Sequence, residues 1–149
     1  MSDSVNDLVP VPLRLVIGFG FAYHGAPKLF SAESHAGFTG MLQNLGVPAA
    51  GLMSWVVGII EFFGGLALIA GAFVSIVSIL LIVNMLAALF KVHLSQGFNF
   101  MHITGMSEGG MTFGMPGYEV SLLYIAGLAA LLLGGAGLYS VDRMRGGAG

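Results

Sequence analysis

The sequence has no cysteine and very little charge. Of its 149 residues, 5 are Lys or Arg and 7 are Asp or Glu, so charged residues make up only 8% of the chain. Without cysteine there can be no disulfide, iron–sulfur cluster, thiolate nucleophile or covalently attached haem. Charge this sparse cannot cover a soluble domain of this length, because small domains leave much of their surface exposed.

Basic surface is also lacking. The formal net charge is −2, which excludes the cationic surface that nucleic acid requires, so no nucleic-acid partner is expected. Hydrophobic residues instead make up 56% of the chain, and the mean hydropathy is strongly positive. We therefore predict an integral membrane protein whose main partner is the lipid bilayer.

The apolar segments have the lengths of membrane-spanning helices. A bilayer core of about 30 Å needs roughly 20 apolar residues in a helix. The segments that fit are residues 8–30, 50–71, 72–95 and 118–138. We predict an all-α membrane protein, a four-transmembrane-helix bundle that forms one domain over residues 1–142, followed by a disordered tail over 143–149. Gly71 is the predicted break between the second and third spans.

The segments between the spans are more polar. Residues 31–46 are predicted to form an extramembrane loop or an interfacial helix, and the Gly- and Met-rich residues 96–117 a loop packed on the bundle. Residues 1–7 carry no Lys or Arg, so we expect no secretory signal and a first span that stays in the mature protein.

An even number of spans puts both termini on one side of the membrane. That side holds Arg14, Arg143 and Arg145, and the opposite side holds Lys28 and Lys91. The positive-inside rule then favours cytoplasmic termini by a margin of one residue. We expect a multi-pass protein of the bacterial inner membrane.

Charged residues inside the spans are the informative positions, because each costs at least about 2.5 kcal/mol near the membrane centre. At about 100° per residue, one face of the first span carries a series of charged, small and aromatic residues. This series is Arg14, Gly18, Phe21, Gly25 and Lys28, with His24 one turn before Lys28. In the second span, Glu61 lies near mid-membrane, and Gly58, Gly64 and Gly65 would allow a neighbouring helix to approach it.

Alternating helix directions bring most of these polar residues toward the end away from the termini. We predict a site there in which Glu61 and Glu119 relay protons. The predicted ligand-binding residues are His24, Lys28, Asn84, Lys91, His93 and Tyr118, and the predicted structural residues are Arg14, Gly25, Gly64 and Gly65. Asn84 and Lys91 are seven residues apart and share a helix face, whereas His93 points elsewhere. Simpler interpretations remain: Lys28 and Lys91 could extend to the headgroups, and Glu61 could be protonated.

Metal cofactors are not expected. His24 and His93 are not in i, i+4 pairs with other ligands, so neither haem nor a metal site is predicted. Met101, Met106, Met111, Met115 and His102 are types of residue that bind Cu(I), but methionine is also an ordinary packing residue, so copper is not expected either.

A series of short motifs resembles the DoxX family from Leu13 to Asp142. The motifs are L-R-L-V-I-G with Arg14, H-G-A-P-K-L with His24, Gly25 and Lys28, E-F-F-G-G-L-A-L-I-A-G with Glu61, K-V-H-L-S-Q-G-F with His93, Gly117-Tyr118-Glu119, and G-L-Y-S-V-D at residues 137–142. The resemblance implies a four-helix membrane subunit linked to respiratory or redox complexes, including the membrane subunit of thiosulfate:quinone oxidoreductase.

Three functional hypotheses follow. In the first, the chain is a small membrane subunit of a bacterial respiratory or redox complex that binds a quinone or a similar small polar ligand, with other redox subunits as partners. In the second, it is a non-catalytic scaffold or assembly subunit whose internal charges fix helix register, and a homo-oligomer is one form that it could take. In the third, it is a small proton or solute carrier, although no inverted repeat is evident.

Overall fold

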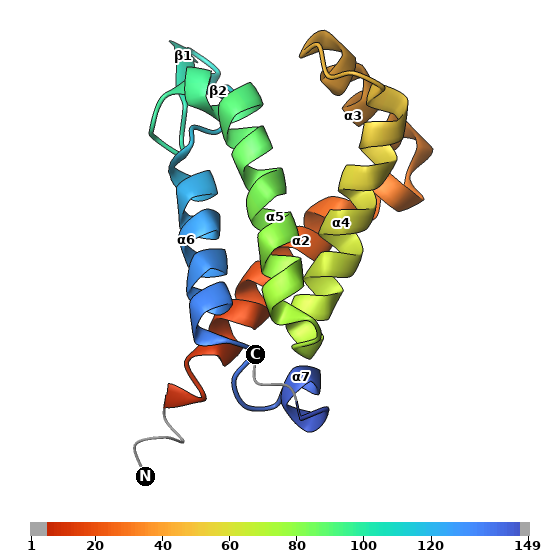
Figure 1. The fold of residues 1–149 in the computed structure, drawn as a ribbon. Helices are drawn as coiled ribbons and strands as arrows, with labels where there is room; N and C mark the ends of the chain where they lie inside the picture. The colour runs from red at the N-terminus through yellow and green to blue at the C-terminus, as the bar shows by residue number, and fades with distance from the viewer. Residues whose placement is uncertain (1–5, 147–149) are drawn as a thin grey trace.

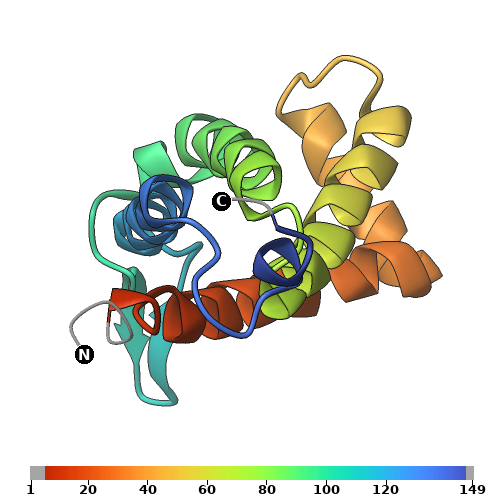
Figure 2. The ribbon, with the colours of Figure 1, turned by 60° about the horizontal axis from the view of Figure 1, so that its bottom comes forward.

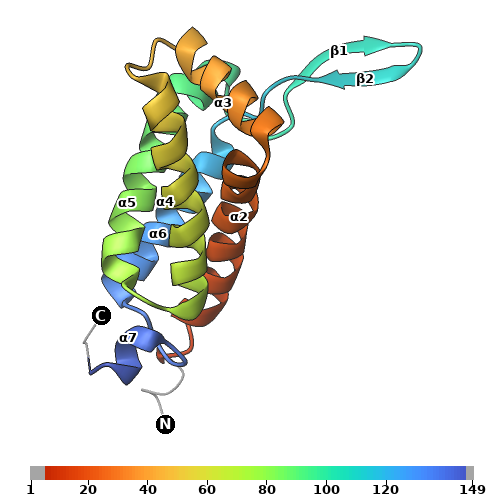
Figure 3. The ribbon, with the colours of Figure 1, turned by 90° about the vertical axis from the view of Figure 1, so that its right-hand side faces the viewer.

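The computed structural model describes residues 6–146, and within them four long helices run side by side (Figures 1 and 3). These helices are α2 (Pro10–Phe30), α4 (Ala50–Ala70), α5 (Val74–Ala88) and α6 (Glu119–Gly134). Pro10 and Pro12 lie in the first turn of α2, where a missing N–H costs no helical hydrogen bond. Gly71 ends α4 in the left-handed conformation with φ of 68°, which confirms the predicted break.

Shorter elements connect and extend the long helices. Helix α3 (Ala32–Asn44) is capped by Ser31, whose side chain accepts from the N–H of Ser34, so this segment is a helix rather than a loop. After α5 come a π-helical turn (Leu89–His93) and a 3-10 turn (Leu94–Gln96). Strands β1 (Ile103–Ser107) and β2 (Gly110–Phe113) form a hairpin, and α7 (Val141–Met144) follows α6.

Two helices among the described residues are long and apolar enough to cross a membrane: Ala50–Ala70, and α5 with its two terminal turns, Val74–Gln96. They coincide closely with the predicted second and third spans. Helix α2 is also 21 residues long but carries Arg14, His24 and Lys28. Helix α6 has 16 residues and so is about 24 Å long. It ends at Gly134, earlier than predicted.

The core lies where these helices meet, and α2 packs most extensively against α4. Its fully buried members include Leu68 of α4, Leu81 of α5 and Leu128 of α6. The predicted face of α2 is confirmed at Arg14, Gly18, Phe21 and Gly25, all of which are buried. Most other large apolar residues, such as Val16 and Leu133, are exposed, as expected for helices that meet lipid.

One end of the bundle is closed by a group of polar contacts that we call the Arg14 cluster: Arg14, Gly71, Ala136, Tyr139 and Asp142. The Arg14 guanidinium donates to the carbonyls of Ala136 (2.6 Å) and Tyr139 (3.1 Å). The Asp142 carboxylate accepts from the N–H groups of Phe73 (2.7 Å) and Val74 (2.9 Å) at the start of α5. Figure 2 brings this end forward, with α7 over the turn between α4 and α5.

Two predictions about the connecting segments and the tail need correction. Residues 96–117 do not form a loop packed on the bundle, because β1 and β2 stand out from it (Figure 3) and most of their residues are exposed. Residues 143–146 are not disordered: Arg143 belongs to α7 and pairs with Asp7 (2.6 Å). The rest of the predicted tail, 147–149, lies outside the described residues.

Candidate functional site

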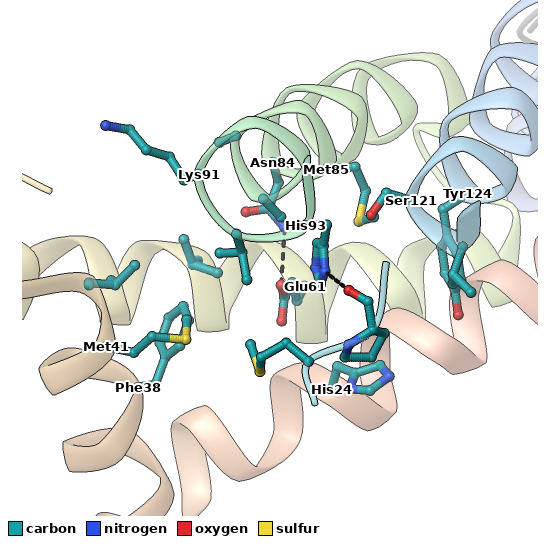
Figure 4. A pocket seen from close by; sticks show the side chains of 18 of the residues that line it. His24, Phe38, Met41, Glu61, Asn84, Met85, Lys91, His93, Ser121 and Tyr124 are labelled. Carbon is teal, nitrogen blue, oxygen red and sulfur yellow. Dashed lines mark hydrogen bonds between the residues drawn. The ribbon is translucent and has the colours of Figure 1, made fainter. Parts of the chain in front are cut away.

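A cavity of about 430 Å³, shown from close by in Figure 4, is lined by the C-terminal half of α2 and so lies away from the Arg14 cluster. It is lined by residues of α2, α3, α4, α5 and α6, together with the π-helical turn and residues 115–117. Its polar lining residues are His24, Lys28, Glu61, Asn84, Lys91, His93, Ser121 and Tyr124. The volume is within the usual range for a small-molecule site, about 300–1,000 Å³.

The polar centre of the cavity is a cluster of three side chains, which we call the Lys28–Glu61–Asn84 cluster. The Lys28 ammonium pairs with Glu61 Oε2, and Asn84 Nδ2 donates to Glu61 Oε1 at 3.0 Å. The carboxylate is therefore held by a separate donor on each oxygen, from α2 and from α5. Lys28 also lies over the ring of Phe38, 4.5 Å from its centroid, a cation–π arrangement that helps to keep the ammonium inside.

Close packing of α2 on α4 brings Lys28 and Glu61 together. A Cβ atom on Gly25 would lie 2.4 Å from the backbone nitrogen of Phe62, and one on Gly65 would lie 2.5 Å from that of Ala22. Only glycine permits this approach, as predicted for Gly65; Gly25 was predicted as a structural residue. Gly64 differs, because a Cβ there would be 3.4 Å from its nearest neighbour on α5, an ordinary contact.

The π-helical turn changes which residues of α5 face the cavity. A π-turn holds one residue more than an α-turn, so it rotates the following side chains by about 100°. Lys91, predicted to share a face with Asn84, is exposed, and its ammonium extends away from Glu61 (Figure 4). His93, predicted to point elsewhere, lies at the cavity with its Nδ1 2.9 Å from the carbonyl oxygen of Pro116.

The His93 contact also determines which ring nitrogen donates a hydrogen bond and which one accepts. A carbonyl oxygen can only accept, so Nδ1 of His93 carries a proton and Nε2 is the acceptor of the neutral ring. Among the described residues, Nε2 of His93 has no hydrogen-bond partner. The ring therefore has one polar atom left for a ligand.

Helix α3 covers part of the cavity with Phe38, Met41 and Leu42. His35 attaches α3 to the bundle: its Nδ1 is 2.8 Å from the carbonyl of Lys28 on α2, and its Nε2 is 3.1 Å from Ser54 Oγ on α4. The His35 ring also stacks on Trp55, with the centroids 4.2 Å apart. Polar contacts to two helices thus fix α3 over the ligand space.

The structure brings together six of the eight residues predicted to carry the chemistry: His24, Lys28, Glu61, Asn84, Lys91 and His93 all line the cavity. Glu119 and Tyr118 do not. The Glu119 carboxylate accepts from the N–H of Phe100 (3.0 Å), and the Tyr118 ring packs edge-on against Phe98. Both residues therefore hold the chain around residues 97–100. Arg14 is at the opposite end, as predicted.

Sequence reasoning missed Ser121 and Tyr124, which line the cavity from α6. Their spacing of three residues within an apolar span was a usable signal, because such residues share a helix face. The Tyr124 ring packs edge-on against Phe21 at 5.2 Å. Asp142 was noted only as part of a motif, and its capping of α5 depends on a contact 68 residues away in sequence.

No cluster of three or more His, Asp or Glu side chains with metal-binding geometry occurs within residues 6–146. The cavity instead combines an apolar wall with a neutral ion pair, an amide and an imidazole. These groups can donate and accept hydrogen bonds and can move a proton.

The comparisons with known proteins agree with the sequence motifs. The DoxX family profile matches residues 9–94. An uncharacterized protein of Haemophilus influenzae is 31% identical over 131 residues, which cover 87% of this chain and 85% of that protein. An uncharacterized membrane protein of Mycobacterium tuberculosis is 28% identical over 133 residues, which cover 88% of this chain and 77% of that protein. No solved structure matches. The chain is therefore a membrane protein of the DoxX family.

Proposed function

We propose that this chain is the membrane subunit of a bacterial redox complex and that its cavity binds a quinone headgroup within the bilayer. In this proposal α2, α4, α5 and α6 all cross the inner membrane, with both termini cytoplasmic. The observation that carries the proposal is the cavity of about 430 Å³, with its mainly apolar wall and the Lys28–Glu61–Asn84 cluster. Helix α2 can span despite Arg14 and Lys28 because Arg14 is buried and Lys28 is paired with Glu61 of α4.

The cavity residues fit a quinone headgroup. Such a ligand is flat and largely apolar, with two carbonyl oxygens that need donors. Lys28 has N–H groups beyond the one it gives to Glu61, and Asn84 has a second amide N–H. A quinone accepts two electrons and two protons when it is reduced. Glu61 and His93 Nε2 are the groups of this chain that can hold or pass such protons.

Electrons must come from another subunit. The chain has no cysteine for an iron–sulfur cluster, and no side chain that lines the cavity can supply the two electrons that reduce a quinone. A redox partner would dock so that its cofactor lies near the cavity end. The motif resemblance supports this role, since better-understood DoxX proteins are linked to respiratory complexes.

A first experiment asks what the chain carries from its native membrane. The protein is extracted in mild detergent, and co-purifying molecules are identified by mass spectrometry and an absorption spectrum. We expect near-stoichiometric quinone or a cofactor-bearing partner. A colourless preparation with neither would contradict the proposal.

A second experiment measures binding of a short-chain ubiquinone by quenching of the single tryptophan, Trp55, which stacks on the α3 residue His35. We expect Glu61→Gln to weaken binding about tenfold, or about 1.4 kcal/mol, because the proton acceptor and the partner of Lys28 are lost. Glu108→Gln is the matched control, since Glu108 is exposed and does not line the cavity. Equal affinity in both variants would remove Glu61 from the site.

The second candidate is the scaffold role, favoured by the ion pair that joins α2 to α4 at their closest packing. If the pair only fixes register, the double variant Lys28→Met with Glu61→Gln should be more stable than either single variant, because neither charge is then left unpaired. The double variant should also retain assembly with partner subunits. Loss of quinone binding with intact assembly would favour the redox proposal instead.

A further inference from the structure

The hairpin of β1 and β2 has one apolar face. Ile103 pairs with Phe113 and Met106 pairs with Met111, and residues directly opposite each other in an antiparallel ladder point to the same side. Met111 and Phe113 are two residues apart and also share a side. The irregularity between Ile103 and Gly105 shifts the register by one residue, which puts Ile103 on the side of Met106. All four apolar side chains therefore lie on one face.

The opposite face is polar. Thr104 and Thr112 lie there, and the Thr104 hydroxyl donates to the carbonyl of Thr112 at 3.2 Å. The apolar residues have no cover within the described part of the chain: Met106 is 79% exposed and Phe113 is 59% exposed. A two-stranded hairpin is only marginally stable alone in water, so an exposed apolar face of this kind needs a partner surface.

The position of the hairpin relative to the bundle bears on what the partner surface is. It projects sideways from the bundle at the end opposite α7, across the long axis of the helices (Figure 3). The chain between α5 and the hairpin also exposes the apolar side chains of Phe90, Leu94, Phe98 and Phe100, at 48–66% exposure, among polar residues such as Ser95 and Asn99. These apolar residues lie between α5, which is long and apolar enough to span a membrane, and the hairpin.

We infer that the hairpin lies on the bilayer surface, with the apolar face of Ile103, Met106, Met111 and Phe113 in the lipid interface and the threonine face toward water. The scarcity of charged residues supports lipid as the partner, bound through burial of the apolar side chains. Between Leu94 and Gly117 the only charged residue is Glu108, in the turn of the hairpin, and the exposed Lys91 lies before this stretch. The hairpin itself therefore carries no Lys or Arg for anionic headgroups or for an acidic protein surface. The inference is independent of what the cavity binds.

The absence of cysteine makes a direct test possible, because a single introduced cysteine can be labelled without background. Met106→Cys and Thr112→Cys, on opposite faces, each receive an environment-sensitive fluorophore, and each protein is reconstituted into phosphatidylcholine vesicles. A lipid with a nitroxide high on its acyl chain serves as the quencher. We expect a blue-shifted emission from the label at position 106 and about threefold stronger quenching than at position 112. Met111→Cys provides a second site on the apolar face.

Two outcomes would overturn the inference. Equal, water-like emission at all three positions would mean that the hairpin stands away from the lipid. Exposure of the label at position 106 in pure vesicles, combined with protection in native membranes, would mean that a protein covers the face instead. Tryptophan emission and a monodisperse elution profile, compared with the unmodified protein, show that each labelled variant is folded.

Discussion

The two ends of the bundle each hold a cation, one buried and one partly buried, but they bind it in different ways. Arg14 is 1% exposed, and the partners of its guanidinium are backbone carbonyls in the segment between α6 and α7. Lys28 is paired with a side chain, Glu61, which is itself 8% exposed and bonded to Asn84. Only the second arrangement lines a cavity.

The residue types explain the difference. The planar guanidinium of arginine has five N–H groups and can reach several fixed carbonyls at once. It satisfies oxygens that would otherwise be left without donors where helices end. Lysine is a compact charge with rotatable N–H groups, and a carboxylate can gain or lose a proton. The Arg14 end is therefore suited to closing the fold, and the Lys28 end to binding and proton transfer.

The largest expected effect comes from breaking the Arg14 end. Arg14→Leu leaves the carbonyls of Ala136 and Tyr139 without their donor, at about 1–3 kcal/mol each. We expect the free energy of unfolding to fall by about 3 kcal/mol, measured by denaturant titration in detergent. Quinone affinity of the folded fraction should be unchanged. A fall in affinity without a fall in stability would reverse the roles assigned to the two ends.

The next largest effect is expected from a substitution that forces α2 away from α4 at the cavity end. Gly25→Ala puts a methyl group against the backbone of Phe62, and we expect a loss of about 2 kcal/mol in the free energy of unfolding from overpacking. Gly64→Ala, at the contact between α4 and α5, where a Cβ has ordinary clearance, is the control and should change stability little. Equal losses would mean that the close approach of α2 and α4 does not hold in the membrane.

A smaller effect is expected at the start of α5. Asp142→Ala removes the acceptor for the N–H groups of Phe73 and Val74, and losing a helix cap costs about 1 kcal/mol. Thermal unfolding should detect this change. The comparison is Asp7→Ala, which breaks the exposed pair with Arg143 and should cost less, because exposed ion pairs contribute little. A larger loss from Asp7→Ala would show that the pair with Arg143 closes this end.

The smallest effect sharpens the description of the cavity. Lys91 is at the rim with its ammonium directed away from Glu61, so Lys91→Gln should leave ubiquinone affinity within about twofold of the parent protein, under about 0.5 kcal/mol. His93→Gln should weaken binding more, because the imidazole Nε2 is lost. The reverse order would indicate that the π-helical turn after α5 is absent when a ligand is bound.

The amino-acid sequence by itself determined the membrane character, the family and several local features. The scarcity of charge and the motif series were enough for the first two. Helical periodicity identified the buried face of α2, and Gly71 marked the break between two apolar segments, because these signals depend only on neighbouring residues. The sequence also placed Lys28, Glu61 and Asn84 in one candidate site, because charged side chains inside membrane spans need polar partners.

Other features were decided only by the tertiary structure. Glu119 and Tyr118 hold the chain near Phe100, while Ser121 and Tyr124 face the cavity, because the rotation of α6 is fixed by its packing against α2 and α5. The π-helical turn exchanged the roles expected of Lys91 and His93. The carboxylate of Asp142 accepts a hydrogen bond from the N–H of Val74 at the start of α5, although the two residues are 68 apart in sequence. Periodicity fixes the face on which a residue lies, but which faces meet depends on how the helices pack against one another.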